Sequence, residues 1–435
     1  MNRRSFLAAA ASSVAVDFAA PARGAIPFTG GNRRKVIVVG GGLAGLSCAY
    51  ELRKYGHEVV LLEGQERPGG RVQTLRKGLG PELTAEAGAT RIPDTHQLTL
   101  SYVHEFGLAL EPFNRGALDD VVHLRGRNYS VGHAPEPNWP LSLSSEERRF
   151  GRRGLAELYL SKPLKRAKGL ENSPNIPRVI LEQDGSTVYE YLNRRGLSSG
   201  AIELLTVGMD TKISSALLLL VAFNEQISRQ YYHIRGGNDQ LPHALAKRLN
   251  GVISYGSRVT SMGQDGSSAW AVFTHAEERK EIRADYLVSA LPFSVAANLF
   301  ADARLSSEKQ RVIRELRYFP VDKVFLQMRR QFWRANGQSG FANTDLLSER
   351  FWALGLNSPD QRGLLLSYVI GSKAAKLDQM DPESRAEQTL SDAERVFPGA
   401  RQHFEASRTK SWNHDPWQPF GVWSLRTQFY PDRCT

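Results

Sequence analysis

The pattern of hydrophobic and polar residues predicts a strand–helix–strand unit early in the chain. Residues 35–39 and 58–62 are almost continuously apolar, which is typical of short strands buried inside a parallel sheet. Between them, residues 43–55 repeat apolar side chains at helical spacing, and Gly56 is placed to end that helix. This segment predicts an α/β fold.

The remainder of the chain predicts a second kind of structure interleaved with the first. Residues 98–216 favour helices broken by loops that contain proline and glycine. The stretch "YYHIRGGNDQLPHALAKRL" predicts a loop followed by an amphipathic helix. Later stretches predict strands, namely "VISYGSRVTSM", "WAVFTHAEERKEIRADYLVSALP", "VDKVFLQMRRQFW" and "GLLLSYVIG". A chain of 435 residues is too long for one compact core, so we expect two or three domains. One of them would be a nucleotide-binding domain built from separated pieces of the chain.

Composition indicates an ordinary globular protein, with 41% hydrophobic and 23% charged residues. The formal net charge of +11 would suit acidic partners, but no stripe of basic and aromatic residues stands out. We therefore expect a basic surface and no nucleic-acid partner. The two cysteines, Cys48 and Cys434, have neither metal-ligand spacing nor a disulfide framework, so no metal site is expected.

The N-terminal stretch "MNRRSFLAAAASSVAVDFAAPARGA" predicts an export signal. It combines paired arginines, an apolar run over residues 6–16 and a small-residue cleavage candidate at residues 20–22. The run is too short to span a bilayer as a helix, and no later segment predicts a stable membrane span. "NRRSFL" resembles the twin-arginine signal, which implies export by the twin-arginine machinery to the periplasm or the exterior after a cofactor has been inserted. The alternative is a frayed basic terminus.

Gly40, Gly42 and Gly45 form a Gly-x-Gly-x-x-Gly motif between the first strand and the helix. The first glycine allows a tight turn, the second lets a pyrophosphate approach the backbone, and the third lets the helix pack on the strand. Glu63 follows 18 residues after Gly45, at the end of the second strand, where a carboxylate can accept hydrogen bonds from ribose hydroxyls. The motif therefore predicts a dinucleotide site, for NAD or for FAD.

The next residues, "ERPGGR" at 66–71, favour FAD. Paired glycines expose backbone N–H groups, and arginines can bind phosphate oxygens. Over residues 35–113 the sequence resembles the flavin-containing amine oxidase family, and again at "HIRGGNDQLPHALAKRL", "RADYLVSALP" and "KVFLQMRRQFW". The resemblance implies a glutathione-reductase-like, Rossmann-type FAD domain interleaved with a mixed α+β substrate-binding domain that carries a helical insertion. The FAD-binding residues that it implies are Gly40, Gly42, Ala44, Gly45, Glu63, Arg67, Gly69, Gly70, Arg71, Gly88, Ala89, Thr90 and Val259.

The same resemblance implies the domain boundaries. We expect an export signal and linker over 1–30, FAD-binding segments over 31–97 and 229–303, helical and substrate-binding segments over 98–228 and 304–420, and an aberrant tail over 421–435.

The stretch "EAGATRIPDTHQL" bears on the substrate. It is similar to the Gly-x-x-Arg-x-Pro segment of L-amino-acid oxidases and tryptophan monooxygenase-like enzymes, in which the arginine pairs with the substrate carboxylate. Arg91 would have that role, because a planar guanidinium binds a carboxylate through two parallel hydrogen bonds. Tyr368 aligns with a tyrosine that helps to bind the carboxylate. The alternatives are a surface arginine and a core aromatic residue.

Lys323 aligns with a lysine that contacts flavin N5 through a water molecule and promotes the reaction of reduced flavin with O2. The alternative is a solvated lysine. The family continues beyond the tryptophan-containing segment "SWNHDPWQPFG" with a Gly-Glu pair and a closing helix. This chain contains no Gly-Glu dipeptide and runs instead "VWSLRTQFYPDRCT". We therefore expect a chain truncated at the C-terminal FAD segment, by a frameshift in one hypothesis.

Together these features predict FAD-dependent oxidative deamination of L-amino acids. The α-carbon hydride would pass to flavin N5, the imine would hydrolyse to a keto acid and ammonia, and O2 would be reduced to H2O2. An amine or polyamine oxidase and a flavin desaturase are alternatives within the superfamily. A different class of protein, a truncated and non-catalytic remnant unable to hold FAD, is the further alternative.

Overall fold

The computed structural model describes residues 33–81, 83–113, 118–162, 186–211, 216, 230–302, 305–355, 362–417 and 422–424. The chain divides into two units, residues 1–33 and 34–435, and all the helices and strands of the described residues belong to the second. The predicted export signal over 1–30 lies outside the described residues, as does the predicted tail apart from residues 422–424.

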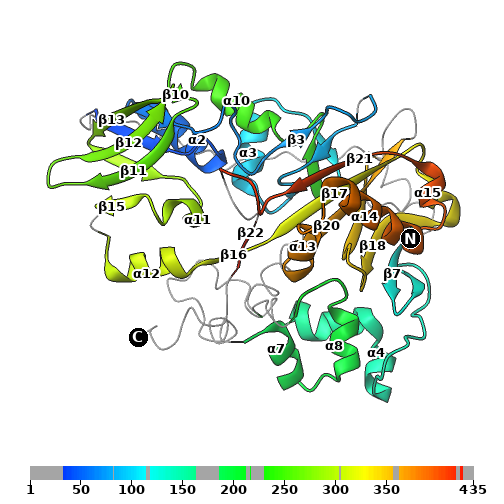
Figure 1. Ribbon diagram of the computed structural model, residues 1–435. Coiled ribbons are helices and arrows are strands. Elements are labelled where there is room, and N and C mark those ends of the chain that lie inside the picture. The colour runs from blue at the N-terminus through cyan, green and yellow to red at the C-terminus, as the bar shows by residue number, and fades with distance from the viewer. Residues whose placement is uncertain are drawn as a thin grey trace, which may run out of the picture. The chain divides into compact units, whose positions relative to one another are not determined.

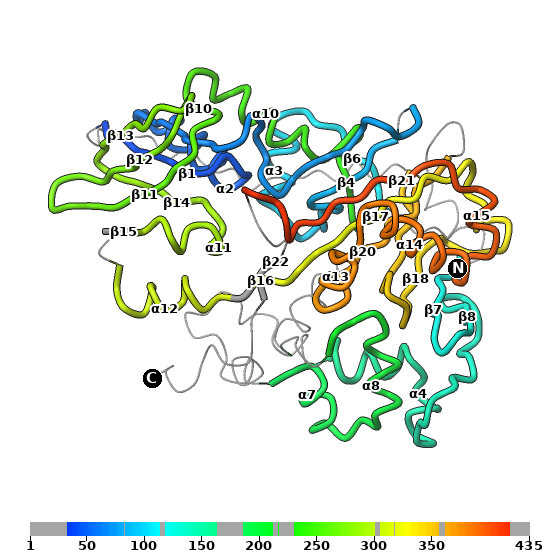
Figure 2. Tube along the Cα trace, in the orientation of Figure 1, coloured from blue at the N-terminus to red at the C-terminus, as the bar shows by residue number. Residues whose placement is uncertain are grey.

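Four parallel strands form one sheet in the order β10-β2-β1-β14. They are β1 (Lys35–Val39), β2 (Glu58–Leu62), β10 (Ile253–Ser254) and β14 (Tyr286–Ser289). Helix α2 (Leu43–Lys54) connects β1 to β2, so the predicted strand–helix–strand unit is confirmed. Helix α10 (Gln240–Arg248) packs with α2 against the same face of β1. Figure 2 shows β1 beside β14, although the two strands are far apart in the sequence.

The other face of this sheet is covered by a small antiparallel sheet. Its strands are β11 (Arg258–Gln264), β12 (Ala269–His275) and β13 (Glu278–Ala284), with β15 (Phe300–Asp302) parallel to β11. Ile37 and Val39 of β1 pack with Met262 and Ala271 in this layer. Both faces of β1 are therefore covered, which explains why residues 36–39 are all apolar.

A seven-stranded sheet forms the second layered region, in the order β21-β17-β20-β19-β18-β7-β8 (Figure 1). The strands are β7 (Asp119–Leu124), β8 (Arg127–Val131), β17 (Val321–Met328), β18 (Gln338–Thr344), β19 (Arg350–Leu354), β20 (Gly363–Ile370) and β21 (Phe404–Ser411). Helix α14 (Pro382–Val396) packs on one face, and Leu83 and Ala85 pack on the other. Because both faces are covered, every residue of β17 is buried.

The remaining elements connect or extend these sheets. The helices are α3 (Gln97–Glu105), α4 (Ser145–Ala156), η1 (Glu157–Ser161), α7 (Val188–Arg194), α8 (Ser199–Leu205), α11 (Phe293–Ala296), α12 (Ser307–Glu315), η2 (Phe332–Asn336), α13 (Ser372–Leu377) and α15 (Ala400–His403). The short strands are β3 (Thr74–Leu75), β4 (Ala85–Glu86), β5 (Ile92–Pro93), β6 (Leu110–Pro112), β9 (Tyr231–Ile234), β16 (Arg317–Phe319) and β22 (Val422–Ser424).

The prediction of helices over residues 98–216 is wrong for part of that range. Strands β7 and β8 form a hairpin that joins the seven-stranded sheet. Its turn, Arg125–Gly126, has φ values of 51° and 76°, which suit a two-residue hairpin. The hairpin is fixed by parallel pairing of β7 with the distant β18, and a local pattern cannot reveal that contact.

Candidate active site

A cavity of about 990 Å³ lies at the carboxyl ends of β1 and β2, where ligands bind to open α/β sheets. It is lined by the turn between β1 and α2, the end of β2, the GGR turn, and the segment between β10 and β11. Nine of the predicted cofactor residues line it, namely Gly40, Gly42, Ala44, Glu63, Gly69, Gly70, Arg71, Ala89 and Val259.

The three glycines of the motif differ in the space around them, that is, in which atoms a Cβ at each position would meet. Gly40 has a φ of 105°, and an ideal Cβ on Gly45 would lie 1.9 Å from the Gly40 carbonyl oxygen. These two positions therefore need glycine for the turn and for the packing of α2 on β1. At Gly42, no described atom lies within 4 Å of an ideal Cβ, so this position faces open space. Gly42 is the N-cap of α2 and makes no side-chain cap, which leaves the N–H groups of the first turn available to phosphate.

Glu63 ties the end of β2 to the glycine turn. Its Oε2 accepts from the Gly41 N–H at 2.5 Å, and its Oε1 accepts from the Gln65 N–H at 2.7 Å. The side chain is 7% exposed, and burial raises the pKa of the carboxyl group. The carboxylate is thus held at the cavity wall by backbone donors.

Gly45, Arg67, Gly88 and Thr90 are not among the residues that line the cavity. Arg67 donates from Nη2 to the Gly70 carbonyl oxygen at 3.1 Å and from Nη1 to that of Pro68 at 3.3 Å, so it braces the GGR turn. An ideal Cβ on Gly88 would lie 1.8 Å from the Arg71 carbonyl oxygen. Arg67 and Gly88 thus contact the GGR turn, which forms part of the cavity wall.

Lys323, on β17, holds the segment of residues 86–90. Its Nζ donates to the carbonyl oxygens of Glu86 at 2.9 Å and Gly88 at 2.5 Å, and to Thr90 Oγ1 at 2.8 Å. The side chain is 4% exposed, and burial lowers the pKa of Lys323 to about 7. The three ammonium hydrogens thus have three protein acceptors.

The other carbonyl groups of segment 86–90 are also hydrogen-bonded. Trp412 Nε1 donates to the Ala87 oxygen at 2.8 Å, and Asn238 Nδ2 donates to the oxygens of Ala89 at 2.9 Å and Thr90 at 3.2 Å. Every carbonyl group from residue 86 to residue 90 therefore accepts a hydrogen bond. This fixes a segment that places Ala89 in the cavity wall and leads directly to Arg91.

The sequence analysis missed Glu86, a buried carboxyl group beside Lys323. Its Oε2 accepts from Thr74 Oγ1 at 3.0 Å and its Oε1 from the Asn238 N–H at 2.8 Å. Burial raises the pKa of Glu86 to about 7, and Lys323 opposes that rise. The sequence offered one indication of this residue: Glu86 is a carboxylate in an apolar stretch, two residues before Gly88.

Arg91 lies among aromatic side chains. Its Cζ is 4.4 Å from the ring centroid of Tyr231 and 4.8 Å from that of Trp352. The rings of Trp352 and Tyr368 are 5.3 Å apart, and Lys323 Nζ lies 5.1 Å from the Tyr368 ring. The structure therefore brings the predicted Arg91, Tyr368 and Lys323 together, and adds an aromatic cluster of Tyr231, Trp352 and Tyr368.

The sequence model of the flavin-containing amine oxidoreductases matches residues 43–433. The chain belongs to this family. An L-amino acid oxidase of Crotalus durissus terrificus, bordonein-L, is 27% identical over 412 residues, which are 90% of this chain and 77% of that protein. An L-amino-acid oxidase of Naja atra is 26% identical and covers 96% of this chain and 83% of its own length.

Solved structures of this family share the fold. A putrescine oxidase triple mutant matches with a TM-score of 0.77 and 19% identity, over 91% of this chain and 89% of that chain. The cyclohexylamine oxidase of Brevibacterium oxydans IH-35A matches with a TM-score of 0.75 and 19% identity, over 92% and 89%. The predicted fold is thereby confirmed.

FAD is the cofactor of this family, and the cavity fits it. The uncapped start of α2 and the open space at Gly42 suit a pyrophosphate, and the Glu63 carboxylate at the end of β2 suits a ribose. Arg71 adds a cation to the same wall. Glu63, Gly42 and Arg71 would therefore hold the cofactor of this flavin amine oxidoreductase.

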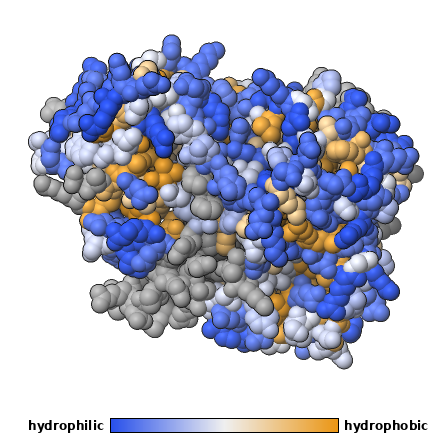
Figure 3. Space-filling view, viewed as in Figure 1, coloured by the Kyte–Doolittle hydropathy of each residue, from blue (hydrophilic) through white to orange (hydrophobic). Residues whose placement is uncertain are grey.

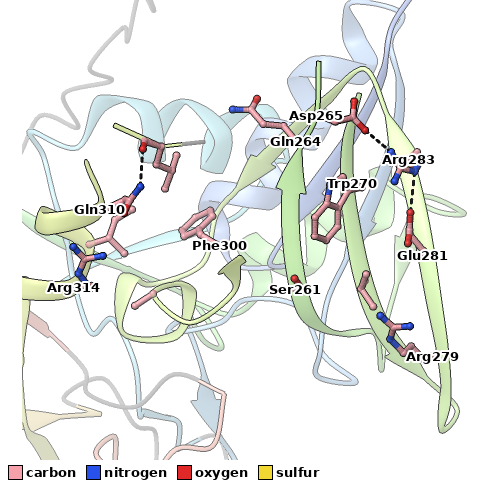
Figure 4. Close-up of a pocket in the computed structure, with 14 residues that line it drawn as sticks. Ser261, Gln264, Asp265, Trp270, Arg279, Glu281, Arg283, Phe300, Gln310 and Arg314 are labelled. Carbon is pink, nitrogen blue, oxygen red and sulfur yellow. Dashed lines mark hydrogen bonds and ion pairs between the residues drawn. The ribbon is translucent and has the colours of Figure 1, made fainter. Parts of the chain in front are cut away.

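A second hollow, of about 840 Å³, lies between the β11–β13 sheet and helices α11 and α12 (Figure 4). Figure 3 shows apolar side chains gathered over this part of the surface. Arg283 pairs there with Asp265 at 2.7 Å and Glu281 at 2.9 Å. The hollow shares no lining residue with the cofactor cavity, so it is not the candidate active site.

Within the described ranges, no three or more His, Cys, Asp and Glu side chains lie where they could hold a metal ion. No helix among the described residues is both long and apolar enough to cross a membrane.

Proposed function

We propose that this chain catalyses the FAD-dependent oxidative deamination of L-amino acids. The observation that carries the proposal is the place of the Arg91 guanidinium, over the rings of Tyr231 and Trp352 and near Tyr368, whose ring is also contacted by Lys323. Bound FAD would accept the α-carbon hydride and return the electrons to O2 as H2O2, and water would convert the imine to a keto acid and ammonia.

Arg91 would bind the substrate carboxylate. Contact with two aromatic rings positions the guanidinium, whose planar fork of N–H donors matches the geometry of a carboxylate. A carboxylate can accept from two of these donors at once, whereas an amine without a carboxylate offers no matching pair of acceptor oxygens.

Lys323 would assist the reaction with O2. Its pKa of about 7 lets it hold or release a proton near neutral pH. Its three hydrogen bonds hold it against segment 86–90, which also contains Ala89 of the cavity wall.

The named relatives support an amino-acid substrate, since both are L-amino-acid oxidases. The structural neighbours are named for amines without a carboxylate, putrescine and cyclohexylamine. The carboxylate is therefore the group that an experiment should vary.

The test is the visible absorption spectrum of the purified chain before and after anaerobic addition of L-phenylalanine. A bound-flavin spectrum that bleaches with L-phenylalanine, but not with D-phenylalanine or phenethylamine, supports the proposal. Bleaching by phenethylamine alone would favour an amine oxidase. A colourless chain that does not take up added FAD would favour the non-catalytic remnant.

We also propose export through the twin-arginine machinery, on the strength of "NRRSFL". Replacement of both arginines of this signal by lysine should retain the protein in the cytoplasm. Unchanged export of the variant would contradict the proposal.

A further inference from the structure

Trp417 lines the cofactor cavity, although the sequence analysis predicted no role for it. It follows β21 in the chain and reaches the wall formed by Glu63, Gly64 and Arg258. Its side chain is half-buried, so one part packs on protein and another remains available. The tryptophan therefore belongs to the cavity rather than to the core.

Gly64 makes room for this indole. An ideal Cβ on Gly64 would lie 2.3 Å from Trp417 Cζ3 and 2.8 Å from Cε3, far inside van der Waals contact. Gly64 is not among the glycines with positive φ, so the backbone itself would accept another residue. The position is kept small by its contact with Trp417.

The backbone of Trp417 is held by its own turn. The Trp417 N–H donates to Asp415 Oδ1 at 3.1 Å, and Lys410 Nζ of β21 donates to Asp415 Oδ2 at 2.6 Å. Asp415 is buried. On the cavity side, the guanidinium carbon of Arg258 lies 5.8 Å from the Trp417 ring centroid. The turn that carries the indole is thus held by hydrogen bonds of the protein itself.

The position of Trp417 along the cavity indicates which half of FAD it meets. Glu63, at the end of β2, occupies the place of the acidic residue that binds the adenosine ribose, and Gly64 is the next residue. A base attached to that ribose lies beyond Glu63, away from the glycine turn that faces the pyrophosphate. An aromatic side chain there offers a stacking surface to a purine.

We propose that Trp417 binds the adenine of FAD by stacking, and that Gly64 lets the indole reach it. The proposal rests on FAD as the cofactor and does not depend on the substrate. Loss of one base–aromatic stack weakens binding by about tenfold. The flavin half should be unaffected.

The test uses the full-length chain freed of FAD and titrated with FAD, ADP and FMN. Trp417→Ala should weaken the binding of FAD and ADP by about tenfold and leave FMN unchanged. Trp417→Phe should restore most of the affinity, because it keeps an aromatic face. Trp270→Ala, in the separate hollow of Figure 4, is the matched control and should change neither ligand.

Fluorescence supplies a second readout. The chain has 7 tryptophans. The quenching of Trp417 fluorescence by a ligand is therefore obtained by subtracting the quenching measured in Trp417→Phe from that measured in the parent. ADP, which has no flavin to accept energy, should still quench that component. Absence of any such component would overturn the proposal, as would a parent chain that does not bind ADP.

A double-mutant cycle tests the role of Gly64. Gly64→Ala should weaken ADP binding several-fold in the parent, because the new methyl group displaces the indole, and should add little in the Trp417→Ala background. Additive losses would overturn the proposed coupling. An equal loss of FMN binding in Trp417→Ala would show a general collapse of the cavity and would also overturn it. None of these outcomes depends on turnover, so failure of the proposed function leaves them readable.

Discussion

Lys323 and Glu86 interact twice, through the backbone and through charge. Lys323 Nζ donates to the Glu86 carbonyl oxygen at 2.9 Å, while the Glu86 carboxyl group favours the ammonium form of Lys323. Burial lowers the pKa of Lys323 to about 7 and raises that of Glu86 to about 7. Asp239 raises the pKa of Glu86 further, and Arg76 pairs with Asp239 at 2.6 Å.

Glu86→Gln should therefore shift the pH dependence of flavin reoxidation. The amide oxygen can still accept from Thr74 or Asn238, but the negative charge that favours the Lys323 ammonium is gone. The pKa of Lys323 should fall further, and the limb of the profile that reports it should move to lower pH by about half a unit to one unit. Stopped-flow reoxidation across pH 5–9 measures this. Glu405→Gln, a carboxylate on β21, is the control, and an upward shift in Glu86→Gln would contradict the coupling.

Arg91→Ala should reduce kcat/KM for L-amino acids by about 100-fold without loss of bound flavin. The reason is the loss of two charge-assisted hydrogen bonds to the carboxylate. Arg91→Lys should recover only part, because an ammonium lacks the planar fork. Flavin content is read from the visible spectrum. A parallel loss of flavin would assign Arg91 to the structure of the cavity instead.

Alanine at two glycines of the motif should separate packing from ligand contact. Gly45→Ala places a methyl group 1.9 Å from the Gly40 oxygen, so we expect a lower melting temperature even without FAD. Gly42→Ala meets no described atom within 4 Å, and should keep the melting temperature of the FAD-free chain but weaken FAD binding. Equal effects of the two variants on the FAD-free chain would be the contrary result.

Arg385 lies between two buried carboxyl groups. Its Nη1 lies 2.7 Å from Asp322 Oδ2, and its Nη2 lies 3.6 Å from Asp378 Oδ1. Arg385→Met should lower the free energy of unfolding by about 3–5 kcal/mol, because two buried carboxyl groups lose the guanidinium that lies between them. Glu203→Gln, at the exposed pair with Arg125, should change it by about 0.5 kcal/mol or less. Urea unfolding at pH 7 compares them, and similar small losses would contradict the prediction.

The same cluster gives stability a pH dependence. Burial raises the pKa of Asp322 from 3.8 to about 8, so between these values the native state binds more protons than the unfolded state. Its stabilising contribution is complete below pH 4 and is lost as the pH rises to about 8. The melting temperature of the parent should therefore fall relative to that of Asp322→Asn between pH 5 and pH 8. A difference independent of pH would contradict this assignment.

Local patterns predicted the parts of the site that are contiguous in the chain. The glycine turn, α2 and Glu63 lie within one strand–helix–strand unit, and each position has a local reason for its residue type. Arg91, Tyr368 and Lys323 were identified through family resemblance, and the structure places them together. Their roles stay predictions.

What the sequence did not predict depends on contacts between distant residues. Glu86 and Lys323 are 237 positions apart, and nothing near either residue indicates their interaction. Tyr231 and Trp352 reach Arg91 from β9 and β19, two separate strands. Trp417 contacts Gly64 across most of the chain. Each of these contacts requires the tertiary fold.

The pairing of β1 with β14 sets the order in which this protein can be completed during synthesis. Lys35 N–H donates to Asp285, 250 positions later, and Val36 is paired with Tyr286. Until the ribosome has released the chain beyond β14, β1 has a neighbour on one side only, and Ala290 and Leu291 of the cavity wall do not yet exist. A nascent chain therefore cannot close its cofactor cavity early, and fragments that stop before residue 290 should emerge unable to retain the flavin.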